Sequence, residues 1–403
     1  MATSSKSLPH TASQSIECDV YSAKILVVDD ISLMRDLIGD CLTGAGYRTV
    51  LFASSGEEAI KIAEQEPIDL VILDIKMPGL DGFEVCERLR KNPLLKSLPI
   101  LVQSADEKPE QRAKVFRSGA TDFVSKPINQ PELLARVRLH LEKSFLIESL
   151  TQYQQNMEQE LMLAQDMQRL ILPQRKAIAS FEEIFDVKIE TEYEGTAALA
   201  GDLWGIWQQS PSSLGMYLLD VSGHGVSAAL NTFRLHAIMD RFRDEKADPG
   251  KFMESLNAVL CDALPTGQFA TMVCLVLDVD TGQLSYAGAG APRPVIMKEG
   301  GGLSLLHTEG VPLGISIDSK YETKSEQINP GECILCYSDV FIEAKCDDET
   351  LLGEAGFLSM VTAAKEASCS QGLVHTLVSA FNERFGPSHP DDMTAIALHR
   401  IQR

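Results

Sequence analysis

The stretch KILVVDD, residues 24–30, decides the fold of the first part of the chain, because a run of β-branched apolar residues ends there in two aspartates. Four similar runs follow: TVLFA (49–53), LVILDI (70–75), PILVQSA (99–105) and DFVSK (122–126). Continuous apolar runs of this length indicate strands that are buried on both faces. Helical patterns such as SLMRDLIGDCLTGAG (32–46) and GEEAIKIAEQ (56–65) separate them. Regular alternation of strand and helix predicts an α/β domain with a five-stranded parallel sheet covered by helices.

Polar residues follow four of these five strands. Asp29 and Asp30 follow the first, Asp74 the third, Ser104 the fourth and Lys126 the fifth. The carboxyl ends of parallel strands meet at one edge, so we expect these side chains to converge. Three carboxylates repel one another unless a hard cation lies among them, and Mg²⁺ suits such oxygen ligands. One carboxylate can then accept a phosphoryl group, with the metal and an ammonium group neutralising charge. Taken singly, each aspartate has a plainer interpretation as a helix cap.

Residues 23–142 resemble a response-regulator receiver domain, which has a flavodoxin-like fold. The resemblance rests on VVDD (27–30), DLVILDIKMPGLDGFEVCERLR (69–90) and GATDFVSKP (119–127). It implies that Asp74 is the phosphoacceptor, supplied by a histidine kinase or a phosphotransfer protein. It also implies that Ser104 and Phe123 form the switch pair that responds to phosphorylation. Phe123 stands where a tyrosine is more frequent, which removes a hydroxyl and keeps the ring.

The same resemblance implies a receiver Mg²⁺ site. Its ligands would be the carboxylates of Asp29, Asp30 and Asp74 and the backbone carbonyl of Lys76. Lys126 would bind the phosphoryl group.

Residues 131–172 contain no glycine and no strand pattern, so we expect a long helix that ends before Pro173. Apolar residues recur along it every three or four positions, which is the spacing of a coiled-coil seam. We therefore interpret residues 143–175 as a helical coiled-coil linker and expect a parallel homodimer through residues 143–172. The alternative is a single amphipathic helix that lies on a domain. The seam consists of Leu146, Leu150, Tyr153, Met157, Leu161, Ala164 and Met167.

Strand patterns dominate residues 176–403, with helices expected near 226–243, 249–263 and 350–384. The DTGQ turn at residues 280–283 predicts a hairpin. This region is therefore α+β, a different architecture from the first block.

Single aspartates stand at the ends of several of these strands, in LAGDLWG, LLDVSGHG, YSDV and HPDD. They are Asp202, Asp220, Asp339, Asp391 and Asp392. Carboxylate sites without histidine or cysteine favour Mg²⁺ or Mn²⁺ over Zn²⁺. Two such ions can promote attack of water on phosphorus. Each aspartate alone would fit ordinary turn or cap chemistry.

Residues 176–403 are similar to the metal-dependent serine/threonine protein phosphatases of the PPM or PP2C type, in their bacterial stress-response and sporulation branch. The matching pieces are AGDLW, DVSGHGVSAAL, AGAPRPVIM, EGVPLGI, YSDVFIEA and DDMTAIAL. The resemblance implies a sandwich of two antiparallel sheets flanked by helices. It also implies two Mg²⁺ or Mn²⁺ ions, with Asp220 between them. Asp202 and the carbonyl of Val221 would hold one ion, and Asp339 and Asp391 the other; the role of Asp392 is left open.

Departures from that family raise the question of activity. Gly205 stands where the family usually has an acidic residue, AGAPRP lacks the frequent His-Asn, and Val340 replaces a glycine. Valine suits a strand-like conformation, but it would cost about 1–2 kcal/mol if that glycine had positive φ. All four ligand aspartates are present, so we expect an active enzyme.

Three further residues of this block have two interpretations each. His224 is a candidate general acid, and its plainer interpretation is a residue at a helix N-terminus. Cys333 and Cys336 form a C-x-x-C pair inside a strand, where buried packing is expected and redox chemistry is the alternative.

The combined prediction is a two-component output protein, in which phosphorylation of Asp74 controls a phosphatase through the helix. By resemblance, its substrate would be a phosphorylated anti-sigma-factor antagonist, and the output a change in sigma-factor availability. The alternative is an inactive adaptor that binds a sigma or anti-sigma factor. Hydrolysis of a small phosphorylated molecule is a third reading.

The bulk properties limit the partners. A formal charge of −21 argues against binding to nucleic acid or an anionic membrane surface. No apolar run is long enough to span a membrane, and nine irregularly spaced cysteines favour a reducing cytoplasm. Residues 1–22, rich in serine and threonine, are expected to be a disordered tail.

Overall fold

A computed structural model describes residues 20–105, 109–195, 199–223, 225–265, 267–346, 349–367 and 372–401. The chain divides into two compact units, one up to Met157 and one from Glu158 onward. The division falls inside a single helix, within the predicted linker. No helix among these residues has the length and apolarity that crossing a membrane requires.

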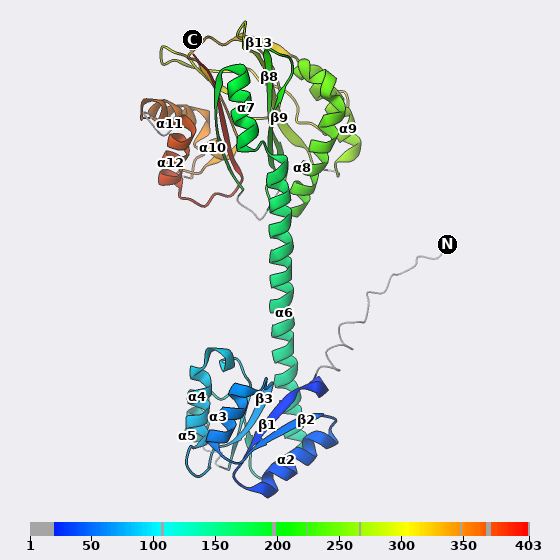
Figure 1. Cartoon of the computed structure of the whole chain (residues 1–403), viewed down its shortest axis with the longest axis vertical. Coiled ribbons are helices and arrows are strands. Elements are labelled where there is room, and N and C mark those ends of the chain that lie inside the picture. Colours follow the sequence, from blue (N-terminus) through cyan, green and yellow to red (C-terminus); the bar gives the residue numbers. More distant parts are fainter. Residues whose placement is uncertain are drawn as a thin grey trace, which may run out of the picture. The chain divides into compact units, whose positions relative to one another are not determined.

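The first unit contains the predicted parallel sheet, in the order β2-β1-β3-β4-β5, with every neighbouring pair parallel. Its α/β architecture is confirmed. Figure 1 shows α2 on one side of this sheet and α3, α4 and α5 on the other. The elements are β1 (Lys24–Val28), α2 (Ser32–Gly44), β2 (Thr49–Ala53), α3 (Gly56–Gln65), β3 (Leu70–Asp74), α4 (Gly82–Lys91), η1 (Pro93–Leu95), β4 (Ile100–Ser104), α5 (Pro109–Arg117), β5 (Asp122–Ser125) and α6 (Gln130–Ile171).

Local signals explain where these helices begin. Ser55 caps α3 by accepting a hydrogen bond from the N–H of Glu58. Asp81 and Glu84 form a capping box at the start of α4. The first turns of α6 bury Leu133, Val137 and Leu141 against the sheet, on the same face as α2.

The predicted tail is shorter than expected. Val20 and Tyr21 were predicted to belong to it, but Val20 is buried and the Tyr21 ring lies 5.6 Å from the ring of Tyr47. Residues 1–19 lie outside the described residues. The ordered part of the first unit therefore includes the two residues before Ser22.

The seam predicted on α6 is present as a line of exposed apolar side chains. Leu146, Leu150, Tyr153, Met157 and Met167 are 41% to 65% exposed. A single chain thus leaves this stripe in water, and its pairing with a second chain stays a prediction.

The second unit is a sandwich of two five-stranded antiparallel sheets, as predicted, with the orders β13-β10-β9-β8-β7 and β12-β11-β14-β15-β6. Helices α8 and α9 lie on one side and α11 and α12 on the other (Figure 1). The elements are α7 (Arg175–Phe185), β6 (Val187–Glu194), β7 (Asp202–Gln208), β8 (Ser213–Val221), α8 (Val226–Met239), η2 (Asp240–Ala247), α9 (Pro249–Ala263), β9 (Ala270–Asp278), β10 (Gln283–Ala289), β11 (Val295–Met297), β12 (Leu303–Leu305), β13 (Lys324–Gln327), β14 (Cys333–Tyr337), α10 (Val340–Glu343), α11 (Gly353–Ala367), α12 (Leu373–Phe385) and β15 (Met393–Arg400).

Two cores hold this unit together. One contains the inner faces of both sheets together with α8 and α9, and the other lies between the second sheet and α11 and α12. Cys333 and Cys336 are buried, unpaired parts of β14, which is the packing role expected for them.

Candidate functional site

The three receiver aspartates meet at the carboxyl edge of the parallel sheet. Asp29 and Asp30 directly follow β1, and Asp74 is the last residue of β3. Because β1 and β3 are neighbours, one carboxylate oxygen from each aspartate lies within 4.8 Å of the other two. Asp29 and Asp74 are buried, whereas Asp30 is exposed.

Lys126 lies between two of these carboxylates. Its Nζ is 3.0 Å from Asp29 Oδ2 and 2.9 Å from Asp74 Oδ2. Burial by itself lowers the pKa of Lys126, but the hydrogen bonds to Asp74 and Asp29 outweigh it and raise that pKa. One ammonium thus faces three carboxylates, and this oxygen-rich, net negative set fits a hard divalent cation such as Mg²⁺.

The backbone around Asp74 is closely packed. Lys76 is exposed two residues beyond β3, at the same edge. Gly82 donates its N–H to the carbonyl of Ile75, and a Cβ at Gly82 would lie 2.3 Å from the carbonyl oxygen of Asp74. A glycine is therefore required where this loop returns to Asp74, a constraint that sequence reasoning missed although the glycine stands inside a quoted motif.

The predicted switch residues lie on β4 and β5, the two strands that follow β3 in the order of the sheet. Ser104 ends β4, and its carbonyl accepts the N–H of Lys126 at 2.8 Å. Phe123 lies in β5, with the guanidinium carbon of Arg112 4.7 Å from its ring centroid and that of Arg136 5.5 Å away. The Phe123 side chain is half-buried, so its exposure to water can either increase or decrease.

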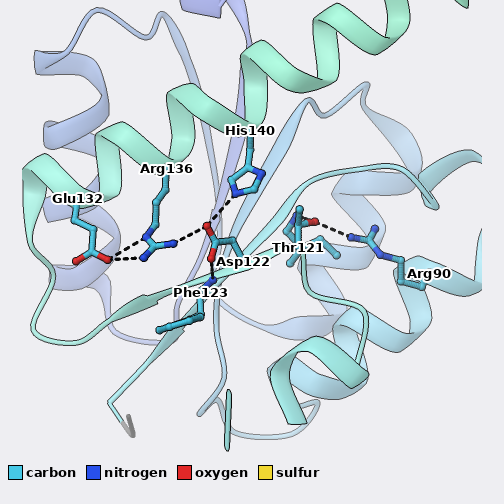
Figure 2. Close-up of polar contacts among 8 residues, drawn as sticks. Arg90, Thr121, Asp122, Phe123, Glu132, Arg136 and His140 are labelled. Carbon is cyan, nitrogen blue, oxygen red and sulfur yellow. Dashed lines mark hydrogen bonds and ion pairs between the residues drawn. The ribbon is translucent and has the colours of Figure 1, made fainter. Parts of the chain in front are cut away.

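A polar cluster that sequence reasoning missed ties β5 to α6 (Figure 2). Asp122 Oδ2 accepts a hydrogen bond from Arg136 at 2.7 Å and lies 3.0 Å from His140 Nε2. Asp122 Oδ1 accepts the N–H of Phe123 at 2.8 Å, and Glu132 pairs with Arg136 from one turn earlier on α6. Burial raises the pKa of Asp122, but the hydrogen bonds from His140, Phe123 and Arg136 outweigh it and lower that pKa. The residue before the aromatic switch thus holds the first turns of α6.

The aspartates of the second unit come from both of its sheets. Asp202 begins β7 and pairs directly with Asp220 on β8, so their side chains lie on the same face. Asp339 follows β14, and Asp391 precedes the neighbouring strand β15. The two sheets approach each other here, because Thr394 Oγ1 on β15 donates to Asp202 Oδ2 at 2.5 Å.

The electrostatics of these aspartates show that they influence one another. Burial, then the charge of Asp220, raises the pKa of Asp202 well above its usual range. Burial, then Asp339 and Asp391, raises the pKa of Asp220 to about 7. Burial, then Asp391 and Glu343, raises the pKa of Asp339 to about 6. Mutually repelling, partly buried carboxylates are a donor set that divalent cations stabilise, so these residues fit the Mg²⁺ or Mn²⁺ implied by the sequence.

This second site is less compact than the receiver site. Among the residues that the structure describes, no three of its carboxylates lie within 4.8 Å of one another. Val221, whose carbonyl was predicted to be a ligand, is buried at the end of β8 beside Asp220. His224 lies outside the described residues.

Asp392 has a structural position that sequence reasoning left open. It is buried, and its Oδ2 accepts the N–H of Gly201 at 2.6 Å. Gly201 directly precedes Asp202, so Asp392 holds the loop that carries a predicted ligand. Glu343, at the end of α10, is a further acidic group near Asp220 and Asp339 that the motifs did not indicate.

Gln168, in the last turns of α6, holds the same loop from the other side. It is buried at 2% exposure, and its Nε2 donates to the carbonyl of Ala200 at 2.6 Å and to Thr232 Oγ1 at 3.2 Å. Its Oε1 accepts the N–H of Ala200 at 3.0 Å. The helix that enters this unit is therefore bonded to the residue two positions before Asp202.

Two departures from the family pattern have clear structural outcomes. Val340 has neither of the two conformations considered for it, strand-like or at positive φ: it begins α10, and Asp339 before it has φ −65° and ψ −24°. Positive φ at non-glycine residues occurs, in the described part, at Asp186 and Glu349 only. Val340 therefore causes no backbone strain. Gly205 is an odd number of residues from Asp202 along β7, so it faces away from the aspartates and toward Tyr217.

Comparisons with known proteins agree with this division. Residues 25–138 match the response regulator receiver domain family, and residues 210–401 match the family of stage II sporulation protein E (SpoIIE). The chain is 38% identical to the transcriptional regulatory protein YvrH of Bacillus subtilis over 31% of its length, and 39% identical to the response regulator PleD of Caulobacter vibrioides over 32%. These matches cover 51% and 29% of the relatives, so the chain spans about half of their length or less.

Solved structures also match the fold of the second unit. The SiaA-PP2C domain of Pseudomonas aeruginosa superposes with a TM-score of 0.54 at 21% identity, covering 61% of this chain and 98% of that domain. The chain therefore contains a receiver domain over residues 25–138, followed by a domain of PP2C fold. That second domain is a PP2C-like phosphatase domain of the SpoIIE family.

Proposed function

We propose that this protein is a metal-dependent phosphoserine/phosphothreonine protein phosphatase whose activity is controlled by phosphorylation of Asp74. The observation that carries the proposal is the convergence of Asp202, Asp220, Asp339 and Asp391 from two sheets. The pKa values of Asp202, Asp220 and Asp339 are raised, and a pair of cations would relieve this repulsion. Nothing in the packing of the domain requires four such carboxylates. Destabilising groups of this kind are kept where they serve a site.

The chain's own residues would divide the work as follows. Asp202 with the carbonyl of Val221 would hold one Mg²⁺ or Mn²⁺, Asp339 with Asp391 the other, and Asp220 both. When bound, the ions would supply Lewis acidity and lower the pKa of water. The protein holds the ligands in place, because Asp392 and Thr394 fix the loop and side chain of Asp202.

In the receiver, Asp29, Asp30, Asp74 and the carbonyl of Lys76 would hold Mg²⁺, and a histidine kinase or phosphotransfer protein would supply the phosphoryl group. Lys126 already contacts Asp74 and would stabilise the added charge.

In each domain, α6 contacts a segment that carries a predicted site residue. In the receiver, Phe123 adjoins Asp122, which is bonded to Arg136 and His140 on α6. In the phosphatase domain, Gln168 on α6 is bonded to the loop before Asp202. We expect the exposed α6 seam to pair in a homodimer, and phosphorylation to act by altering that pairing.

The substrate would be a phosphorylated protein, and the family resemblance favours an anti-sigma-factor antagonist, released for partner switching when dephosphorylated. The adaptor alternative loses part of its basis. Val340 causes no strain, and Gly205 faces away from the aspartates, so neither departure removes a group from the site.

Hydrolysis of p-nitrophenyl phosphate by the full chain with Mn²⁺ tests the proposal, with and without beryllofluoride bound to Asp74. We expect turnover that Asp339→Asn abolishes and that Asp262→Asn, a change of an exposed carboxylate outside the site, leaves unchanged. A difference on adding beryllofluoride would give the direction of control. Absence of turnover in both states, on aryl phosphate and on phosphopeptides alike, would favour the adaptor.

A further inference from the structure

Besides the proposed metal site, the phosphatase domain contains a cavity that lies away from the face of β7 that carries Asp202. It has a volume of about 230 Å³ and is lined by Pro173, Phe181, Trp207, Tyr217, Arg243 and Lys246 among others. Water occupies about 30 Å³ per molecule in the liquid, so the space suits a small metabolite better than one or two waters. It is also smaller than the pockets of about 300–1,000 Å³ that take drug-sized molecules.

Lys246 gives this cavity its chemical character. The residue is 6% exposed, and its Nζ lies 5.2 Å from the centroid of Trp207 and 5.7 Å from that of Phe252. None of the ion pairs found among the described residues involves Lys246. Burial lowers its pKa, which the charge of Asp240 only partly offsets. A buried ammonium without a hydrogen-bonded counter-ion is costly, and the cavity beside it is where a counter-ion fits.

The remaining walls define the rest of the ligand. His236 and Arg243 add basic groups, and Asp240 is the one acidic residue of the lining, so the balance favours an anion. The apolar part of the lining includes Phe181, Ile171 and the rings of Trp207 and Tyr217, whose centroids are 6.2 Å apart. Gly205 allows the Tyr217 ring to pack directly against the backbone of β7, because a Cβ there would lie 2.5 Å from that ring.

We propose that this cavity binds a small aromatic carboxylate, with the carboxylate against Lys246 and Arg243 and the ring among Phe181, Trp207 and Tyr217. The carboxylate would accept charge-assisted hydrogen bonds from both cations and would supply the negative charge that the buried ammonium lacks. Aromatic walls favour a flat apolar body over an aliphatic one. The site is separate from the proposed metal site and does not depend on phosphatase activity. It touches both β7, which begins with Asp202, and the end of α6.

Titration of the full chain with benzoate tests this proposal, with tryptophan fluorescence and calorimetry as readouts. Trp204 and Trp207 are the two tryptophans of the chain, and Trp207 lines the cavity. We expect saturable quenching by benzoate. Benzamide has the same shape without the charge, and it should bind about tenfold more weakly, as one lost charge-assisted contact would give.

The variants separate charge from folding. Lys246→Met should weaken benzoate binding about tenfold or more, and Arg243→Gln, a change of an exposed side chain, by a smaller factor. Lys251→Met, on the neighbouring helix with a side chain 77% exposed, should bind as the parent does. Lys246→Arg keeps the charge and should retain binding if the Met variant fails to fold.

Three results would each overturn the proposal: no saturable response to benzoate, equal affinity for benzoate and benzamide, or unchanged binding in Lys246→Met. Saturable binding of inorganic phosphate without any response to benzoate would also contradict it, since the site would then take an inorganic anion.

Discussion

Replacement of Gln168 should weaken the phosphatase site from outside it. The buried Gln168 amide is the partner of both backbone groups of Ala200, which is itself 3% exposed. Gln168→Met keeps the size of the side chain and removes both bonds. Each buried backbone group left without a partner costs about 1–3 kcal/mol.

The surroundings of Gln168 narrow the expected free-energy cost of losing these hydrogen bonds. A cavity of about 230 Å³ borders Gln168 and Ala200, so water can reach the stranded groups and reduce the cost. We therefore expect the loss of both hydrogen bonds to Ala200 to cost about 3 kcal/mol, which lies in the lower half of the range of about 2–6 kcal/mol for two such groups. A loss of this size makes local opening of the loop about 100-fold more frequent.

Hydrogen exchange of the full chain, followed by mass spectrometry on peptides covering residues 199–204, measures that opening. We expect exchange to accelerate about 100-fold in Gln168→Met and in Gln168→Ala, and Mn²⁺-dependent turnover to fall with it. Asp166→Asn, an exposed change on the same helix, is the control. Exchange at the parent rate in Gln168→Met would refute the reasoning, because packing alone would then hold the loop.

Four other changes test separate parts of the structure. Val340→Gly should destabilise the domain by about 2–3 kcal/mol in urea unfolding and leave turnover unchanged, because Val340 is a buried helical residue. Asp122→Asn should accelerate exchange of residues 130–142 about 30-fold, since losing the partner of Arg136 and His140 costs about 2 kcal/mol. In the metal-free protein, Asp220 and Asp339 hold protons that the unfolded chain releases near pH 4, because their pKa values are about 7 and about 6. The free energy of unfolding should then fall as pH rises from about 4 to 7, and Mn²⁺ should remove this slope. Leu150→Glu should convert a dimer to a monomer in light scattering, because Leu150 is 59% exposed in the single chain.

Each of these has a control or a contrary result. Arg138→Gln breaks an exposed pair on α6 and should change exchange little compared with Asp122→Asn. Stabilisation by Val340→Gly would mean that valine is strained after all. An apo protein that gains stability as pH rises would contradict the raised pKa values. A parent chain that is monomeric at every concentration would remove the seam argument.

The sequence by itself determined the two folds and the position of the receiver site. Strand–helix alternation predicts parallel strands, and parallel strands bring their carboxyl ends to one edge. Asp29, Asp74 and Lys126 are therefore adjacent although Lys126 is 97 residues from Asp29. The aspartate motifs likewise predicted which residues of the second unit lie near one another, since each stands at the end of a strand.

Only the tertiary structure decided which residues support these sites. Gln168 contacts Ala200, and Asp392 contacts Gly201, across 32 and 191 positions of sequence, and no local pattern records such pairs. Valine has a weak local preference for strands, but Val340 starts a helix. Its packing in the core with α11 and α12 outweighs that preference. The charged residues around Lys246 in the sequence are typical of a solvent-exposed segment. Its burial beside Trp207 results from packing against β7. Propensity and periodicity act over a few residues, whereas burial and pairing depend on segments that meet only in the folded chain.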